Sequence, residues 1–171
     1  MQHMVACTGG IMVMAETFDH DVYRRSLARL LRIDDSGCLT MGLNGTFEVQ
    51  PSKHIAIRGA IGPIASLEKK SDLAPLSEPM IGLGRTSSWK ANAFDATDTV
   101  AVFFEVTAPP GSVQAGAPLV LQFRTTYQHS SGQRRLRVAT VSRYWQDAGT
   151  APSALGFDQD AAAVVMSRSV S

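Results

Sequence analysis

The chain has 171 residues, of which 44% are hydrophobic and 18% are charged, and its formal net charge is +1. A chain of this length and composition can bury a core without disulfides or a metal, and its balanced charge argues against a nucleic-acid binder or an acidic tail protein. The longest dense apolar stretch, residues 11–15, is far shorter than the roughly 20 residues that cross a bilayer. No secretory signal peptide opens the chain. We therefore expect a cytosolic protein.

The first 33 residues predict one strand and one helix. The apolar run at 11–14, which follows Gly9 and Gly10, is typical of a strand that is buried on both faces of a parallel sheet. A helix should follow, with Asp19 as its N-cap and Phe18 packed on Tyr23. One strand and one helix cannot form an α/β domain. We therefore interpret residues 1–33 as the C-terminal end of a larger α/β domain, and the chain as part of a longer protein.

Residues 34–146 have the pattern of an antiparallel β-sandwich or barrel, because short alternating apolar runs are separated by Gly, Pro, Asn and Ser. Strands are predicted at residues 46–49, 53–57, 100–106, 119–127 and 135–144, with weaker candidates around Met41 and Trp89. Alternate residues of two strands should face the core, namely Val100, Val102, Phe104 and Val106, and Leu119, Leu121 and Phe123. The polar segment 129–133 should close a hairpin.

After residue 146 the spacing of apolar residues becomes helical, and Asp158 is the expected N-cap of a final helix. We interpret residues 147–171 as the start of a helical domain. The predicted fold is therefore mainly β, with an antiparallel β-sandwich or barrel flanked by an N-terminal βα unit and a C-terminal helix.

The residues that usually carry catalysis or bind metals show no active-site pattern. The two cysteines, Cys7 and Cys38, are interpreted as reduced structural thiols, and none of the four histidines has the spacing of a metal ligand. The two serines after His129 favour a hairpin turn over a serine nucleophile, because such a nucleophile sits between a strand and a helix. Residues 82–85 (Gly-Leu-Gly-Arg) lack the lysine and the third glycine of a phosphate loop, which favours a bulged or edge strand.

A local excess of positive charge lies in residues 106–146, which contain five arginines and no aspartate or glutamate. In the last predicted strand Arg135, Arg137 and Arg143 share a face opposite Leu136 and Val138, so the hairpin should present a basic outer surface. One interpretation is an ordinary solvated strand face. The other is attraction to acidic lipid headgroups, to which each basic residue adds about 1 kcal/mol. The residues proposed for a membrane-facing surface are Arg124, Arg135, Arg137 and Arg143.

Four stretches resemble the inner-coat subunits of the COPII vesicle coat. Residues 127–138 (YQHSSGQRRLRV) resemble the signature hairpin of that family, and Trp145 follows at the expected place. Residues 8–14 (TGGIMVM) resemble the closing strand of the family's α/β trunk, residues 57–63 (IRGAIGP) a strand of its sandwich, and residues 157–163 (FDQDAAA) the opening of its helical domain. The flanks of the hairpin and residues 84–90 (GRTSSWK) are closer to the subunit that activates the coat's small GTPase than to the cargo adaptor.

The resemblance implies a structural and interaction part of that GTPase-activating subunit, acting in endoplasmic reticulum to Golgi transport on the cytosolic face of endoplasmic reticulum and COPII vesicle membranes. The implied partners, through the full-length protein, are the cargo-adaptor subunit, the coat's small GTPase, the outer-coat subunits and an acidic membrane surface, with no nucleic acid. No arginine here matches the one that the family inserts into the GTPase, so no enzymatic role is expected. No cofactor is expected in this chain, because the family's zinc lies in a zinc-finger domain that it lacks.

The resemblance also implies an open sheet edge, since the family completes its sandwich with strands from the N-terminus of the full protein, which are absent here. Such an edge should favour self-association of the chain. Two alternatives remain open. One is the sandwich of the related cargo-adaptor subunit, and the other is a free-standing ligand-binding β-sandwich in which Trp89, Tyr144 and Trp145 line a groove.

Overall fold

The computed structural model describes residue 5 and residues 12–69, 71–74, 81–109, 111–146 and 159–169. In chain order its elements are helix α2 (Asp21–Leu30), strands β1 (Gly42–Pro51), β2 (Ile55–Ile61), β3 (Ala65–Ser66), β4 (Ser88–Phe94), β5 (Ala101–Val106), β6 (Pro118–His129) and β7 (Arg134–Tyr144), and helix α3 (Gln159–Ser169). The predicted N-cap Asp158 lies outside the described residues, as does Ile11 of the predicted N-terminal strand. Strands dominate the fold, so the predicted mainly β class is confirmed.

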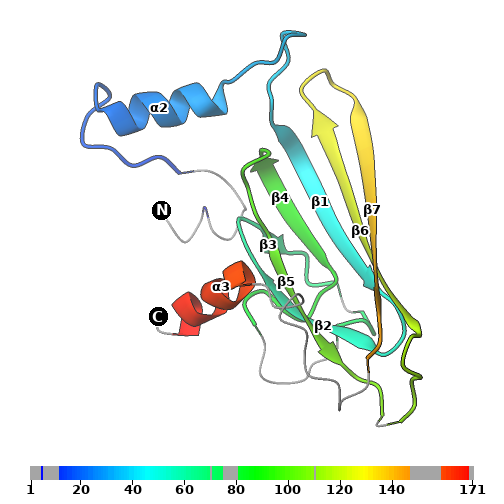
Figure 1. Cartoon of the computed structure of the whole chain (residues 1–171). Helices are drawn as coiled ribbons and strands as arrows, with labels where there is room; N and C mark the ends of the chain where they lie inside the picture. Colours follow the sequence, from blue (N-terminus) through cyan, green and yellow to red (C-terminus); the bar gives the residue numbers. More distant parts are fainter. Residues whose placement is uncertain are drawn as a thin grey trace.

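The strands form two antiparallel sheets (Figure 1). The larger sheet has the order β3-β4-β1-β6-β7, and the smaller one pairs β2 with β5. Every strand predicted from alternation is present, and β6 and β7 form the predicted hairpin. Of the two weaker candidates, Met41 directly precedes β1 and Trp89 lies in β4. The start of β2 is later than predicted, because Lys53 and His54 form a turn in which His54 has a φ of +72°.

The core lies between the two sheets and is centred on Trp89. This side chain is fully buried, and its indole N–H donates to the carbonyl of Leu83 at 3.0 Å. Val49 of the larger sheet and Ile57 and Ala60 of the smaller one belong to the same buried cluster. Because both sheets contribute inward-facing residues to one core, the fold is a sandwich.

Most of the predicted core positions are confirmed. Val100, Val102, Phe104 and Phe123 pack against the buried cluster. The prediction for Val106 was wrong, because β5 ends at this residue and leaves it 60% exposed. Leu119 and Leu121 are half-buried.

The segment at residues 81–87 covers β2 without being a strand, which corrects the prediction of a bulged or edge strand there. Leu83 and Ala60 exchange two backbone hydrogen bonds of 2.8 and 3.2 Å. This close approach requires Gly59, where a Cβ would overlap the carbonyl oxygen of Ile81 and where φ is +151°. A third bond of 3.3 Å runs from the N–H of Ile81 to the carbonyl of Arg58, and Gly82, whose φ is +63°, allows the bend between these contacts.

The predicted N-terminal βα unit is only half confirmed. Its helix is present as α2, and Phe18 packs on Tyr23 with ring centroids 5.2 Å apart. The strand is absent from residues 12–15, which have no regular structure, and Met14 is 73% exposed. A strand is held by hydrogen bonds to a neighbouring strand, and none of the strands in the described part of the chain pairs with this segment. An apolar run by itself is therefore not enough to form one.

Helix α2 begins one residue later than predicted. Its N-cap is His20 instead of Asp19, because the Nδ1 atom of His20 accepts a hydrogen bond of 3.2 Å from the backbone N–H of Val22. None of the residues of α2 is buried, and Figure 1 shows the helix standing off from the sandwich. Within the described ranges, neither helix has the length and apolar character that crossing a membrane requires.

Candidate functional site

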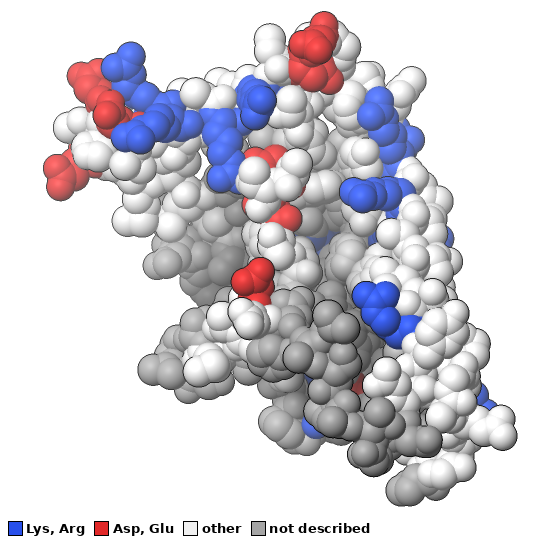
Figure 2. Space-filling model, viewed as in Figure 1, with Lys and Arg blue, Asp and Glu red and all other residues white. Residues whose placement is uncertain are grey.

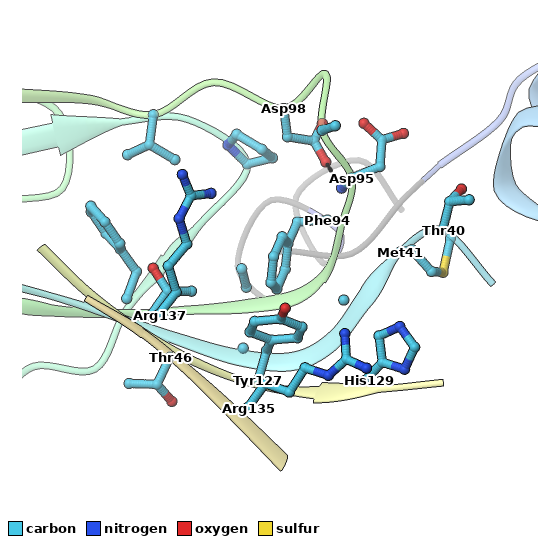
Figure 3. Close-up of a pocket in the computed structure, with 18 of the residues that line it drawn as sticks. Thr40, Met41, Thr46, Phe94, Asp95, Asp98, Tyr127, His129, Arg135 and Arg137 are labelled. Carbon is cyan, nitrogen blue, oxygen red and sulfur yellow. Dashed lines mark hydrogen bonds between the residues drawn. The ribbon is translucent and has the colours of Figure 1, made fainter. Parts of the chain in front are cut away.

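A cavity of about 710 Å³ opens on the face of the larger sheet that also supplies the core. Its walls come from β1, β4, β6 and β7, from the segment before β1, from the connection between β2 and β3 and from the loop after β4. Figure 3 shows an aromatic pair near its centre, aspartates toward one wall and arginines toward the other. These residues are Phe94 and Tyr127, Asp95 and Asp98, and Arg135 and Arg137.

The floor of the cavity depends on two glycines of β1. The Phe94 ring lies over Gly42 and Gly45, and a Cβ added at Gly45 would lie 2.5 Å from a ring carbon. The two glycines flank a register irregularity at Asn44, whose φ is +51°. Phe94 in turn meets Tyr127 edge-on, with 5.6 Å between ring centroids. Because Gly42 and Gly45 have no side chains, β1 leaves room for the aromatic surface of Phe94 and Tyr127.

The basic wall of the cavity is formed by β7. Arg135 and Arg137 stand opposite Tyr127 and Thr125 of β6. Directly paired residues lie on the same side of a sheet, and both arginines line the cavity. Arg143 shares their side of the strand. Three of the four arginines singled out from the sequence are therefore brought to one side of the hairpin.

The fourth, Arg124, lies on the other side of the sheet, where it is paired with Val138 and forms an ion pair of 3.6 Å with Glu48. The expectation of a basic outer surface is thereby corrected. The outer side of β7 carries Leu136 and Val138, which are 58% and 50% exposed. The reason is the register of the hairpin, which fixes the side to which every alternate residue points.

The acidic wall is tied to helix α2 through Arg29. The Nε and Nη2 atoms of Arg29 donate to the two carboxylate oxygens of Asp95 at 2.9 and 3.2 Å, and the N–H of Thr97 donates to the same carboxylate at 2.7 Å. The hydrogen bond from Arg29, followed by those from Thr97, holds the pKa of Asp95 well below its usual range. The same contact raises the pKa of Arg29. The charge of Asp95 is therefore compensated.

The other two aspartates of the cavity serve the neighbouring loops. Asp34 accepts hydrogen bonds of 2.6 Å from the hydroxyl of Ser36 and 3.0 Å from the N–H of Cys38. These bonds, with that of Ser36 first, lower the pKa of Asp34. Asp98 accepts a bond of 2.8 Å from the N–H of Asp95. Both carboxylates thus stabilise turns.

Sequence reasoning missed the contact between Arg29 and Asp95, because 66 residues separate them. The run from Asp95 to Asp98 (Asp-Ala-Thr-Asp) is typical of a turn closed by a side-chain carboxylate, and it could have indicated the loop. No local pattern connects that loop with α2.

The other sites considered from the sequence have structural roles or are absent. The hairpin turn after His129 is confirmed, and the hydroxyl of Ser130 donates to the carbonyl of Leu39 at 3.1 Å. The proposed aromatic groove was wrong, because Trp89 is buried in the core while Tyr144 is 69% exposed, and neither these two nor Trp145 lines the cavity. In the part of the chain that the structure describes, no group of three or more His, Cys, Asp or Glu side chains could hold a metal ion.

The antiparallel sandwich with its long terminal hairpin matches a known domain. A family model described as Sec23/Sec24 beta-sandwich domain covers residues 42–146. The chain belongs to this family. The Sec23/Sec24 β-sandwich therefore begins with β1 and ends just after β7, and the resemblance noted from the sequence is confirmed.

Two relatives from Arabidopsis thaliana are similar over nearly the whole chain, and both carry the Sec23 name. The chain is 42% identical to protein transport protein SEC23 F over 173 residues and 45% identical to protein transport protein SEC23 C over 172 residues, which cover 98% and 96% of the chain. It spans 22% of the length of each relative. A crystal structure of the human COPII-coat protein Sec24c superposes on 81% of this chain and 15% of its own, with a TM-score of 0.49 and 22% sequence identity.

Proposed function

We propose that this chain is a structural and interaction module of the inner COPII coat, as part of the subunit that activates the coat's small GTPase in endoplasmic reticulum to Golgi transport. The match of residues 42–146 to the Sec23/Sec24 β-sandwich, together with 42% and 45% identity to two proteins named SEC23, carries the proposal. In this role the chain contributes surfaces and no chemistry. Stimulation of GTP hydrolysis belongs to the whole subunit.

The partners of the module are those of the whole subunit. They are the cargo-adaptor subunit, the small GTPase and the outer-coat subunits, and they are met on the cytosolic face of endoplasmic reticulum and COPII vesicle membranes. Any zinc belongs to a zinc-finger domain elsewhere in that subunit.

The side of β7 that carries Arg135, Arg137 and Arg143 is the surface that we assign to an acidic membrane. Figure 2 shows Lys and Arg side chains in a row along the part of the molecule where Figure 1 places β7. Among the described residues, no carboxylate forms an ion pair with any of the three. Their charge is therefore available to lipid headgroups, at about 1 kcal/mol for each residue near the surface.

Sedimentation with liposomes of increasing anionic lipid content tests this assignment. Arg137→Gln should weaken binding about fivefold, because it removes one attractive charge from the membrane side. Arg124→Gln is the matched control, since it makes the same change in the same hairpin on the opposite side, and it should have little effect. Equal losses in the two variants, or no loss in Arg137→Gln, would contradict a membrane-facing role for this side of β7.

A further inference from the structure

The outer side of β7 carries a threonine that follows two arginines at a regular spacing. Among the serines and threonines of the sequence, Thr140 alone has arginine both three and five residues before it, namely Arg137 and Arg135. A protein kinase with carboxylates in two subsites of its substrate groove would select this spacing, because each guanidinium can form paired hydrogen bonds with one carboxylate. The pattern therefore points to Thr140 as the target of an arginine-directed kinase.

The hydroxyl of Thr140 is accessible in the folded chain. Thr140 is exposed, and its hydroxyl makes no hydrogen bond with another described residue. Arg135 and Arg137 are exposed as well. By contrast, Ser88, which has Arg85 three residues before it, is only 5% exposed. Burial therefore removes Ser88 as a competing target.

Strand β7 already has the backbone conformation that a substrate groove can bind. An extended segment enters such a groove when its backbone groups are free to pair with those of the partner. The chain is extended from Arg134 to Tyr144, and in the described part of the chain no strand pairs with the outer edge of β7. The segment from Arg135 to Thr140 can therefore be bound without unfolding of the hairpin.

The same side of the hairpin holds an arginine that can receive a phosphate. Arg124 stands opposite Val138, two residues before Thr140, so it is a diagonal neighbour of Thr140. Such neighbours are roughly 7–8 Å apart, within reach of a long side chain. Arg124 is held by Glu48 at 3.6 Å and is 39% exposed. Because Lys69 lies 3.9 Å from the same carboxylate, Glu48 keeps a partner when Arg124 turns toward Thr140.

We propose that Thr140 is phosphorylated by an arginine-directed protein kinase, and that Arg124 binds the resulting phosphate across the hairpin. The hydroxyl oxygen of Thr140 bonds to the γ-phosphorus of ATP, and the bond from that phosphorus to the β–γ bridging oxygen breaks. ADP leaves, and the hydroxyl proton passes to a base of the kinase. The phosphate brings a charge of roughly −1.5 to −2 at pH 7. Since charge on an edge strand opposes pairing, the modification would keep the edge of β7 open.

The site is tested by incubating the full 171-residue chain with ATP, Mg²⁺ and a purified kinase that requires arginine three and five residues before its target. Mass spectrometry should find phosphate on Thr140 and not on Ser142, which is exposed on the same side of β7 but has alanine three residues before it. Arg137→Gln should slow the reaction about tenfold, because it removes one guanidinium contact. Arg143→Gln makes the same change after the target and should leave the rate unchanged. No phosphate on Thr140, an equal amount on Ser142, or equal rates in the two variants would overturn the proposal.

A destabilised variant distinguishes the folded strand from an unfolded hairpin as the substrate. Val49→Ala opens a cavity in the core and raises the unfolded population. The rate at Thr140 should be the same in this variant, because the native strand is the substrate. A rate that rises with the unfolded population would overturn the assignment of the site to the folded chain.

Phosphorus NMR tests the role of Arg124. The second pKa of a phosphothreonine is ordinarily about 6, and Arg124 should lower it by about 0.5 in the folded chain, because a nearby guanidinium favours the dianion. Arg124→Gln should abolish this effect. Arg134→Gln is the control and should preserve it, since Arg134 lies on the same side of β7 but six residues and about 20 Å from Thr140. An unchanged phosphate pKa in Arg124→Gln would overturn the contact across the hairpin.

Discussion

Two glycines of β1 decide the shape of the cavity at the scale of single residues. Gly42 and Gly45 have no side chain, so the Phe94 ring rests on the backbone of β1. A side chain at either position would push the ring outward, into the space that Arg135 and Arg137 line. The position of the Phe94 ring therefore depends on the absence of side chains at Gly42 and Gly45 of the neighbouring strand.

Gly45→Ala tests the importance of this contact. The new methyl would lie 2.5 Å from the Phe94 ring and 3.1 Å from the carbonyl oxygen of Ala91, so the free energy of unfolding should fall by about 1–3 kcal/mol. Urea denaturation measures this change. In the background of Phe94→Leu the same substitution should cost less, because the smaller side chain can move aside. An equal loss in the free energy of unfolding in both backgrounds would show that the Phe94 ring does not restrict the side chain at position 45.

Helix α2 shows how an element is attached without being packed. It buries none of its residues, and the hydrogen-bonded contact of Arg29 with the loop after β4 ties it to the sandwich. Arg29 also donates to the hydroxyl of Thr97 in the same loop. The position of α2 against the sandwich therefore relies on charge and hydrogen bonding.

The pKa of the Asp95 carboxyl, measured by NMR titration, reports this attachment directly. It should lie well below the usual range for aspartate in the native chain, since the Arg29 hydrogen bond favours the ionised form. Arg29→Ala should raise it toward the usual value of about 3.9. Arg25→Ala is the control, because Arg25 forms its ion pair with Asp21 inside the helix. An Asp95 that titrates normally in the native chain would refute the contact.

The contact between Arg29 and Asp95 also determines how the stability of the fold changes at acid pH. A carboxyl whose pKa is lower in the folded than in the unfolded state makes its full contribution to the stability of the fold at any pH above the unfolded-state pKa. This contribution is lost as the pH falls toward the folded-state pKa. For Asp95 this window begins at about pH 4 and extends downward. Asp95→Asn should remove this part of the acid dependence of the melting temperature.

At the scale of the whole molecule, the larger sheet ends at β7, and no strand among the described residues pairs with its outer edge. That strand also exposes Leu136 and Val138 on its outer side. An open edge beside exposed apolar side chains favours pairing with another chain.

Self-association of the chain should therefore depend on β7. Sedimentation should show a mass that rises with concentration, and Val138→Lys should shift the chain toward the monomer, because charge on an edge strand opposes pairing. Val22→Lys is the control, since Val22 is similarly exposed (47%) but lies in helix α2 and in no sheet. A monomeric mass over a wide concentration range would contradict an associating edge.

The sequence by itself determined five of the strands, the hairpin and the family, but not the short strand β3. Alternation at β5 and β6 predicts strands because successive side chains of an extended chain point to opposite sides. The hairpin and the four stretches that resemble the family can likewise be recognised from short segments of the sequence. These features are local, so no knowledge of packing is needed to recognise them.

Only the tertiary structure decided which side of the sheet became the site. That Arg135 and Arg137 share one face follows from the sequence, but that this face is the inner one follows from the pairing of β7 with β6. The bond between Arg29 and Asp95 joins residues 66 positions apart, and the apolar run at 12–15 stays irregular because no strand of the described chain lies beside it. Each of these outcomes depends on partners distant in sequence, and a residue's neighbours along the chain cannot specify them.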